Sequence, residues 1–103
     1  MIVEIIPCLS DNYSYLIHEK ETGTVSIVDP SEFNACDKII NRYKKLDFIL
    51  NTHHHADHVG ANLELKKKYN SKILGSNSDK NRIPGIDISV SYTHLTLPTT
   101  VRV

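Results

Sequence analysis

The sequence of 103 residues contains no tryptophan, one methionine and only two cysteines. Small extracellular domains often compensate for a small core with many disulfides, and two isolated cysteines cannot build such a framework. The spacing of Cys8 and Cys36 also fits no cysteine-based metal or redox motif. We therefore expect two reduced thiols rather than a disulfide.

An excess of charge and long apolar runs are absent as well. Twelve basic side chains balance twelve acidic ones, which argues against a nucleic-acid or membrane surface as partner. No apolar run approaches the length of a transmembrane helix. The start, Met1–Glu4, lacks the basic and long apolar regions of a secretory signal, so we expect a cytoplasmic protein.

The first half of the chain reads as a strand meander followed by a helix. A chain of this length makes at most one small domain. Short runs of β-branched and aromatic residues, separated by turn residues, predict strands over Ile2–Ile6, Tyr13–His18 and Thr24–Val28. We expect Pro7 to end the first strand. Apolar residues at helical spacing predict a helix over Phe33–Lys45.

In the second half, strands alternate with helices. We expect a buried strand over Asp47–Asn51, a helix from about Val59 with Leu63 and Tyr69 on its inner face, and a strand over Lys72–Gly75. A meander followed by such alternation predicts an α/β (α+β) fold with one mixed sheet and helices packed on it.

The most informative stretch is Thr52–His58, called here the histidine segment, which holds four of the six histidines and one carboxylate. Imidazole and carboxylate suit a borderline dication such as zinc. Residues two apart in an extended chain point the same way, so His53 and His55 can converge on one metal. Asp57 and His58, at the turn into a helix, can reach a second metal nearby. The pattern predicts half of a dinuclear metal site.

The histidine segment and its continuation to Asn62 resemble the metal-binding motif of the metallo-β-lactamase superfamily, and within it the glyoxalase II (hydroxyacylglutathione hydrolase) family. Three further pieces agree with that family: Leu9–Tyr15, Ile27–Pro30 and Arg82–Gly85. The resemblance covers about residues 1–88. It implies the amino-terminal part of an αββα sandwich, with one of its two sheets present.

The resemblance also implies a site. Two divalent ions, zinc first with iron or manganese as alternatives, would be held by His53 and His55 on one side and by Asp57 and His58 on the other. Such ions create a hydroxide nucleophile and polarise a carbonyl. The catalytic part assigned to Asp57 is to orient that nucleophile. Two more histidines, a bridging aspartate and the glutathione-binding region would follow residue 88, so this chain offers no assignable substrate-binding residue.

By resemblance, the expected activity is hydrolysis of the thioester S-D-lactoylglutathione to D-lactate and glutathione, a step in methylglyoxal detoxification. The expected partner is this small glutathione thioester, and a monomer is favoured. One alternative is another enzyme of the superfamily, such as a persulfide dioxygenase or a lactonase. The other is a non-catalytic metal-binding fragment, because four ligands shared between two metals leave both sites open.

Two residues near this pattern have more than one interpretation. His54 alternates away from His53 and His55, which indicates a structural rather than a ligating side chain. Asp29 follows a strand and precedes a proline, so it is either a turn residue or a brace for the histidine segment.

The last stretch departs from the family pattern. Ser91–Thr99 resembles the peptide that a transposon-end sequencing adapter encodes when it is translated. We therefore predict that residues 89–103 are a non-native read-through tail, in which His94 is no ligand. The alternative is a genuine strand over Tyr92–Leu97.

Overall fold

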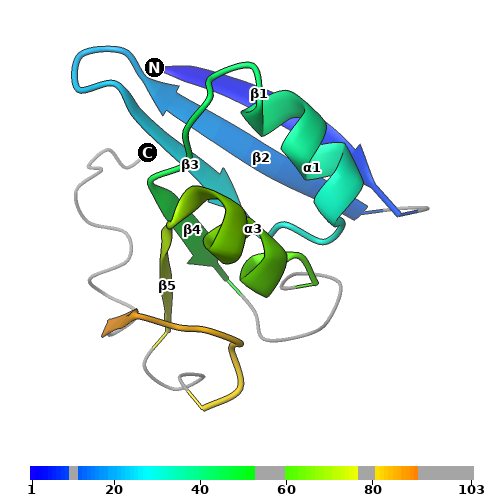
Figure 1. Cartoon of the computed structure of the whole chain (residues 1–103), viewed down its shortest axis with the longest axis vertical. Coiled ribbons are helices and arrows are strands. Elements are labelled where there is room, and N and C mark those ends of the chain that lie inside the picture. Colours follow the sequence, from blue (N-terminus) through cyan, green and yellow to red (C-terminus); the bar gives the residue numbers. More distant parts are fainter. Residues whose placement is uncertain (10–11, 53–59, 77–80, 91–103) are drawn as a thin grey trace.

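A single mixed sheet forms the body of the computed structural model, which describes residues 1–9, 12–52, 60–76 and 81–90 (Figure 1). Its six strands lie in chain order across the sheet. They are β1 (Ile2–Cys8), β2 (Asn12–Glu19), β3 (Thr24–Val28), β4 (Phe48–Asn51), β5 (Lys72–Ser76) and β6 (Ile88–Val90), with helices α1 (Phe33–Ile40) and α3 (Asn62–Tyr69). No helix in these ranges is long and apolar enough to cross a membrane.

The strands change direction halfway across the sheet. β1, β2 and β3 pair antiparallel, whereas β3, β4, β5 and β6 run parallel. Parallel neighbours need a crossover, which α1 supplies between β3 and β4, and α3 between β4 and β5. Both helices cover the same face of the sheet (Figure 1). The mixed sheet with packed helices is confirmed, and the carboxyl ends of β3, β4 and β5 share one edge.

Pro7 does not end the first strand, contrary to our expectation. β1 continues to Cys8, with Pro7 opposite Tyr13. Among the described strands β1 is the outermost, so one of its edges pairs with none of them, and a residue without an N–H is tolerated at such a position.

The inner face of α3 also differs from the prediction. Leu63 is 58% exposed, whereas Leu65 is fully buried. The predicted inner face assumes a helix that starts near Val59, but α3 begins at Asn62. Residues four apart share a helix face, so Ala61, Leu65 and Tyr69 pack inward and Leu63 points outward.

β6 was not predicted from the sequence. Its pairing places Leu74 opposite Ile88 and Gly75 opposite Ser89, so the strand crosses the expected boundary between residues 88 and 89. Asp87 sets this register, because its N–H donates to the Ile73 carbonyl and its carboxylate accepts from the Ile73 N–H, both at 2.8 Å. Residues 91–103 lie outside the described ranges, so the non-native tail stays a prediction.

The core lies between the sheet and the two helices. Its members are apolar side chains from both layers: Ile6, Cys8, Leu16, Val25, Ile27, Cys36, Ile40, Leu46, Ile49, Ala61, Leu65, Ile73 and Ile83. The two cysteines are free, as expected, but they are not isolated in space. Their sulfurs lie 3.7 Å apart, and burial raises the pKa of the Cys36 thiol to about 12.

The opposite face of the sheet is also apolar, and neither α1 nor α3 covers it. The strand register aligns one residue from each strand in a continuous row on this face: Ile5, Tyr15, Val28, Leu50, Leu74 and Ile88. Ile5 is 63% exposed and Tyr15 is 40% exposed. A sheet that is apolar on both faces is typical of the middle layers of a larger sandwich.

We predict that Asp87 makes stability depend on acid. Lys66 Nζ donates to its carboxylate at 2.8 Å, and this bond together with the Ile73 N–H lowers the Asp87 pKa below its ordinary value of 3.8. Since the folded value is the lower one, the stabilisation is present above the ordinary value and is lost as pH falls through the folded value.

The measurement is the free energy of unfolding in urea across acidic pH. Asp87→Asn should flatten the acid side of that curve. An Asp87→Asn curve parallel to that of the unsubstituted chain would contradict the prediction.

Candidate functional site

The predicted ligands His53, His55, Asp57 and His58, together with His54, lie outside the described residues. The structure does describe the residues on both sides of them. Thr52 directly follows β4, and Gly60 and Ala61 directly precede α3. Among the residues that the structure describes, no three metal-ligating side chains gather. The candidate site is therefore defined by how the ends of the histidine segment are held.

Asp29 holds the first end. It follows β3 with a left-handed φ of 51°, and its own N–H donates to the Leu50 carbonyl at 2.9 Å. Its carboxylate accepts a hydrogen bond from the Thr52 N–H at 2.8 Å and a second one from the Thr52 hydroxyl. Asp29 is 7% exposed, so these bonds form away from bulk water. Of the two interpretations from sequence, the brace is the one that the structure supports.

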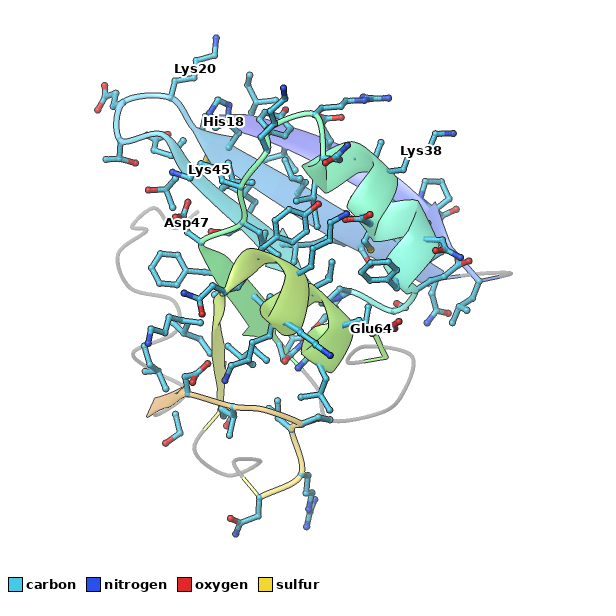
Figure 2. The ribbon with its side chains drawn as sticks, in the orientation of Figure 1. His18, Lys20, Lys38, Lys45, Asp47 and Glu64 are labelled. Carbon is cyan, nitrogen blue, oxygen red and sulfur yellow. The ribbon has the colours of Figure 1, made fainter. Side chains whose placement is uncertain are left out.

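Pro30 holds the second end. Its carbonyl accepts a hydrogen bond from the Ala61 N–H at 2.9 Å, one residue before α3. The connection from β3 to α1 thus lies beside the start of α3, at the edge where the parallel strands end (Figure 1). In Figure 2, Glu64 marks this end of α3, while Lys45 and Asp47 mark the opposite end of β4. Two consecutive residues, Asp29 and Pro30, therefore hold Thr52 and Ala61, the described residues that flank the predicted ligands.

Ser14 forms hydrogen bonds with the backbone on both sides of Pro30. It is fully buried on β2, and its hydroxyl donates to the Asp29 carbonyl at 2.7 Å. The same oxygen accepts from the Ser31 N–H at 3.3 Å. Ser14 belongs to the Leu9–Tyr15 pattern, which by itself predicts no contact for it. The available signal was a serine on the inward register of a strand, between Asn12 and Leu16.

Asn51 and Asn62 connect the two ends directly. Asn51 is the last residue of β4 and Asn62 the first of α3, and both are buried. Their side-chain amides exchange hydrogen bonds, and Asn62 Nδ2 also donates to the Pro84 carbonyl at 3.3 Å. From the sequence, Asn62 is only the last residue of the family motif and Asn51 only the end of a strand, so their contact was not predicted.

The Arg82–Gly85 pattern packs onto the same region. A Cβ added at Gly75 would lie 2.4 Å from Ile83 Cδ1, so the glycine makes room for this buried isoleucine. Gly85 has a φ of 73°, and its carbonyl accepts from Lys66 Nζ at 2.9 Å. The turn therefore rests on β5 and α3. Three sequence patterns that are far apart in the chain meet around the ends of the histidine segment.

Comparison with known proteins agrees with this arrangement. The family described as "Metallo-beta-lactamase superfamily" matches residues 10–95. The hydroxyacylglutathione hydrolase of Pelagibacter ubique is 50% identical over 91 residues, which are 87% of this chain and 38% of that protein. The enzyme of the same name from Methylococcus capsulatus is 45% identical over 86 residues, 82% of this chain and 34% of that protein. This chain thus spans little more than a third of these relatives.

Solved structures show the same fold. The crystal structure of ETHE1 from Myxococcus xanthus aligns with a TM-score of 0.71 at 25% identity, covering 87% of this chain and 40% of that one. BLEG-1 B3 metallo-beta-lactamase aligns with a TM-score of 0.65 over 78% of this chain and 39% of that one. Its 20% identity supports the fold alone.

We predict that Asp29 contributes strongly to folding. Asp29→Ala removes both acceptors of Thr52 and should lower the free energy of unfolding by about 1.5–3 kcal/mol, the range for hydrogen bonds to a charged group. Asp29→Asn keeps one oxygen acceptor and a residue that tolerates a left-handed φ, so it should cost less. Urea unfolding of the two variants checks this, and equal midpoints for both variants and the unsubstituted chain would contradict it.

Proposed function

The chain belongs to the metallo-beta-lactamase superfamily, and on that premise we propose that it forms the amino-terminal part of a metal-dependent thioester hydrolase. The proposed reaction is hydrolysis of S-D-lactoylglutathione to D-lactate and glutathione. The observation that carries the proposal is the histidine segment, whose two ends are held by Asp29 and Pro30 at one edge of the sheet. The names of the relatives, hydroxyacylglutathione hydrolase, support the substrate class.

The donor set fits divalent metal ions. The segment offers three imidazoles and one carboxylate in the positions proposed as ligands, and these groups bind zinc, iron and manganese. We assign His53 and His55 to the first ion and Asp57 and His58 to the second. The described residues fit this role because they fix both ends of a short segment, and a metal site needs ligands that are held in place.

When bound, two such ions lower the pKa of water and polarise the thioester carbonyl. The residues of this chain would hold the ions and orient the reactants. The Asp57 carboxylate would orient the attacking water. The water oxygen then forms the new bond to the acyl carbon, and the carbon–sulfur bond breaks. The products are the carboxylic acid and the glutathione thiol. We place the remaining ligands and the glutathione contacts in sequence that this chain does not contain.

We propose that the 103-residue chain by itself binds metal but has no appreciable thioesterase activity. Four candidate ligands serve two metals, and the apolar row from Ile5 to Ile88 on the second sheet face includes strongly exposed side chains. We further propose a cytoplasmic, monomeric enzyme. The balanced charge supports a small-molecule substrate rather than a nucleic acid or a membrane.

The test uses the protein encoded by the uninterrupted gene, loaded with zinc and supplied with S-D-lactoylglutathione. We expect turnover, and a loss of about 10²-fold in Asp57→Asn, the order expected when a reactant is no longer held in the reactive orientation. Asp47→Asn is the matched control, because Asp47 lies at the other end of β4 and accepts from the Val25 N–H.

The outcomes separate the candidates. Absence of turnover in the zinc-loaded protein would reject the thioesterase. Oxidation of a glutathione persulfide by O₂ in the iron-loaded protein would select the persulfide dioxygenase, and turnover of a lactone would select the lactonase.

A further inference from the structure

The buried amide pair formed by Asn51 and Asn62 stands at the two ends of the histidine segment. We propose that this pair is a positioning clamp, which fixes the distance between the ligands on the strand side of the segment and those on the helix side. The inference rests on the proposed function, because it assumes that the segment binds metal. It goes further by assigning metal affinity to two residues that are not themselves ligands.

The geometry of the pair is reciprocal. Asn62 Nδ2 donates to Asn51 Oδ1 at 2.6 Å, and Asn51 Nδ2 donates to Asn62 Oδ1 at 3.3 Å. Asn51 is 2% exposed and Asn62 is fully buried. Two hydrogen bonds between planar groups fix orientation as well as distance. The end of β4 and the start of α3 are therefore held in one relative position.

Because the pair is buried, loss of either asparagine should disturb the relative position of β4 and α3. Removing one amide would take from the other, within the core, the two hydrogen bonds of the pair, at a cost of about 1–3 kcal/mol. The neighbouring inward positions on the same elements are filled by Ile49 and Leu65, so apolar side chains fit this layer. An amide pair at this point also fixes the relative orientation of β4 and α3, because its hydrogen bonds are directional and apolar contacts are not.

A second set of contacts holds the same ends to β3. Thr52 binds the Asp29 carboxylate, and the Ala61 N–H donates to the Pro30 carbonyl. Those bonds fix each end to a third segment, whereas the amide pair joins the two ends to each other. Asn62 also donates to the Pro84 carbonyl, so the Arg82–Gly85 turn is included in the clamp.

Asn51 and Asn62 lie close in the sequence to the proposed metal ligands. Asn51 lies two residues before His53, and Asn62 lies four residues after His58. A small shift of β4 against α3 would move the ligands of one side relative to those of the other. Residues that orient metal ligands without touching the metal change affinity by about 10–100-fold when replaced. We expect that range for the clamp.

The experiment measures the affinity of the 103-residue chain for Zn²⁺, in competition with a chromophoric chelator. The variants are Asn51→Leu, Asn62→Leu and the double variant. Each single variant should bind Zn²⁺ about 10–100-fold more weakly. The double variant should regain stability toward urea, because neither amide is left in the core without its partner amide, but its affinity should stay as low as that of the single variants.

Ser71→Ala is the matched control. Ser71 is as buried as Asn51, and its hydroxyl donates to the Leu46 carbonyl at 2.8 Å, at the opposite end of the strands. We expect it to lose stability and to keep its affinity for Zn²⁺. The absorption spectrum of bound Co²⁺ adds a second measurement, since it should change in the clamp variants and not in Ser71→Ala.

Three results would decide the matter. Loss of affinity in the clamp variants but not in Ser71→Ala supports the clamp. Full affinity in the stable double variant overturns it and leaves the amides with a purely structural role. If His53→Ala/His55→Ala binds Zn²⁺ as tightly as the unsubstituted chain, the proposed metal site itself is wrong, irrespective of the clamp.

Discussion

The hydrogen bonds between the Asp29 carboxylate and Thr52 are the contact on which the arrangement of the site depends. A carboxylate that is 7% exposed must be compensated where it is buried. Asp29 obtains that compensation from the first residue of the histidine segment. The next residue, Pro30, receives the N–H of Ala61 at the other end. A turn after one strand thereby holds Thr52 and Ala61, which flank the predicted ligands.

This dependence explains why separate sequence patterns occur together. Ser14, on β2, holds the backbone of Asp29 and Ser31. Pro84, in the turn before β6, accepts from Asn62 at the start of α3. Each pattern is short and would be weak evidence alone. In the fold they surround one edge of the sheet, where the carboxyl ends of parallel strands commonly carry the functional residues of α/β proteins.

Much of the fold was readable from local signals. Short runs of β-branched, aromatic and other apolar residues between turn residues marked five of the six described strands, and the helix from Phe33 followed from its apolar repeat. The signals failed where tertiary contacts decide. β6 depends on Asp87 reaching the backbone of Ile73, and the inner face of α3 depends on where the helix begins. The contact between Cys8 and Cys36 joins a strand to a helix, and no sequence spacing reveals it.

The candidate site divides in the same way. The ligand set stays a prediction, based on imidazoles and a carboxylate at close spacing, because these residues lie outside the described part of the chain. The buried amides of Asn51 and Asn62 carry no chemical signature of this kind, since an asparagine next to a loop is ordinary until its partner is known. Asp29 lay between these cases, with a brace and a turn both open until the bonds to Thr52 were seen.

X-ray absorption at the zinc edge of the zinc-loaded chain can distinguish metal binding by the histidine segment from metal binding by the buried thiols. Binding by the histidine segment predicts nitrogen and oxygen neighbours at about 2.0–2.2 Å with the multiple-scattering pattern of imidazole. A shell of sulfur at about 2.3 Å, from Cys8 and Cys36, would contradict it.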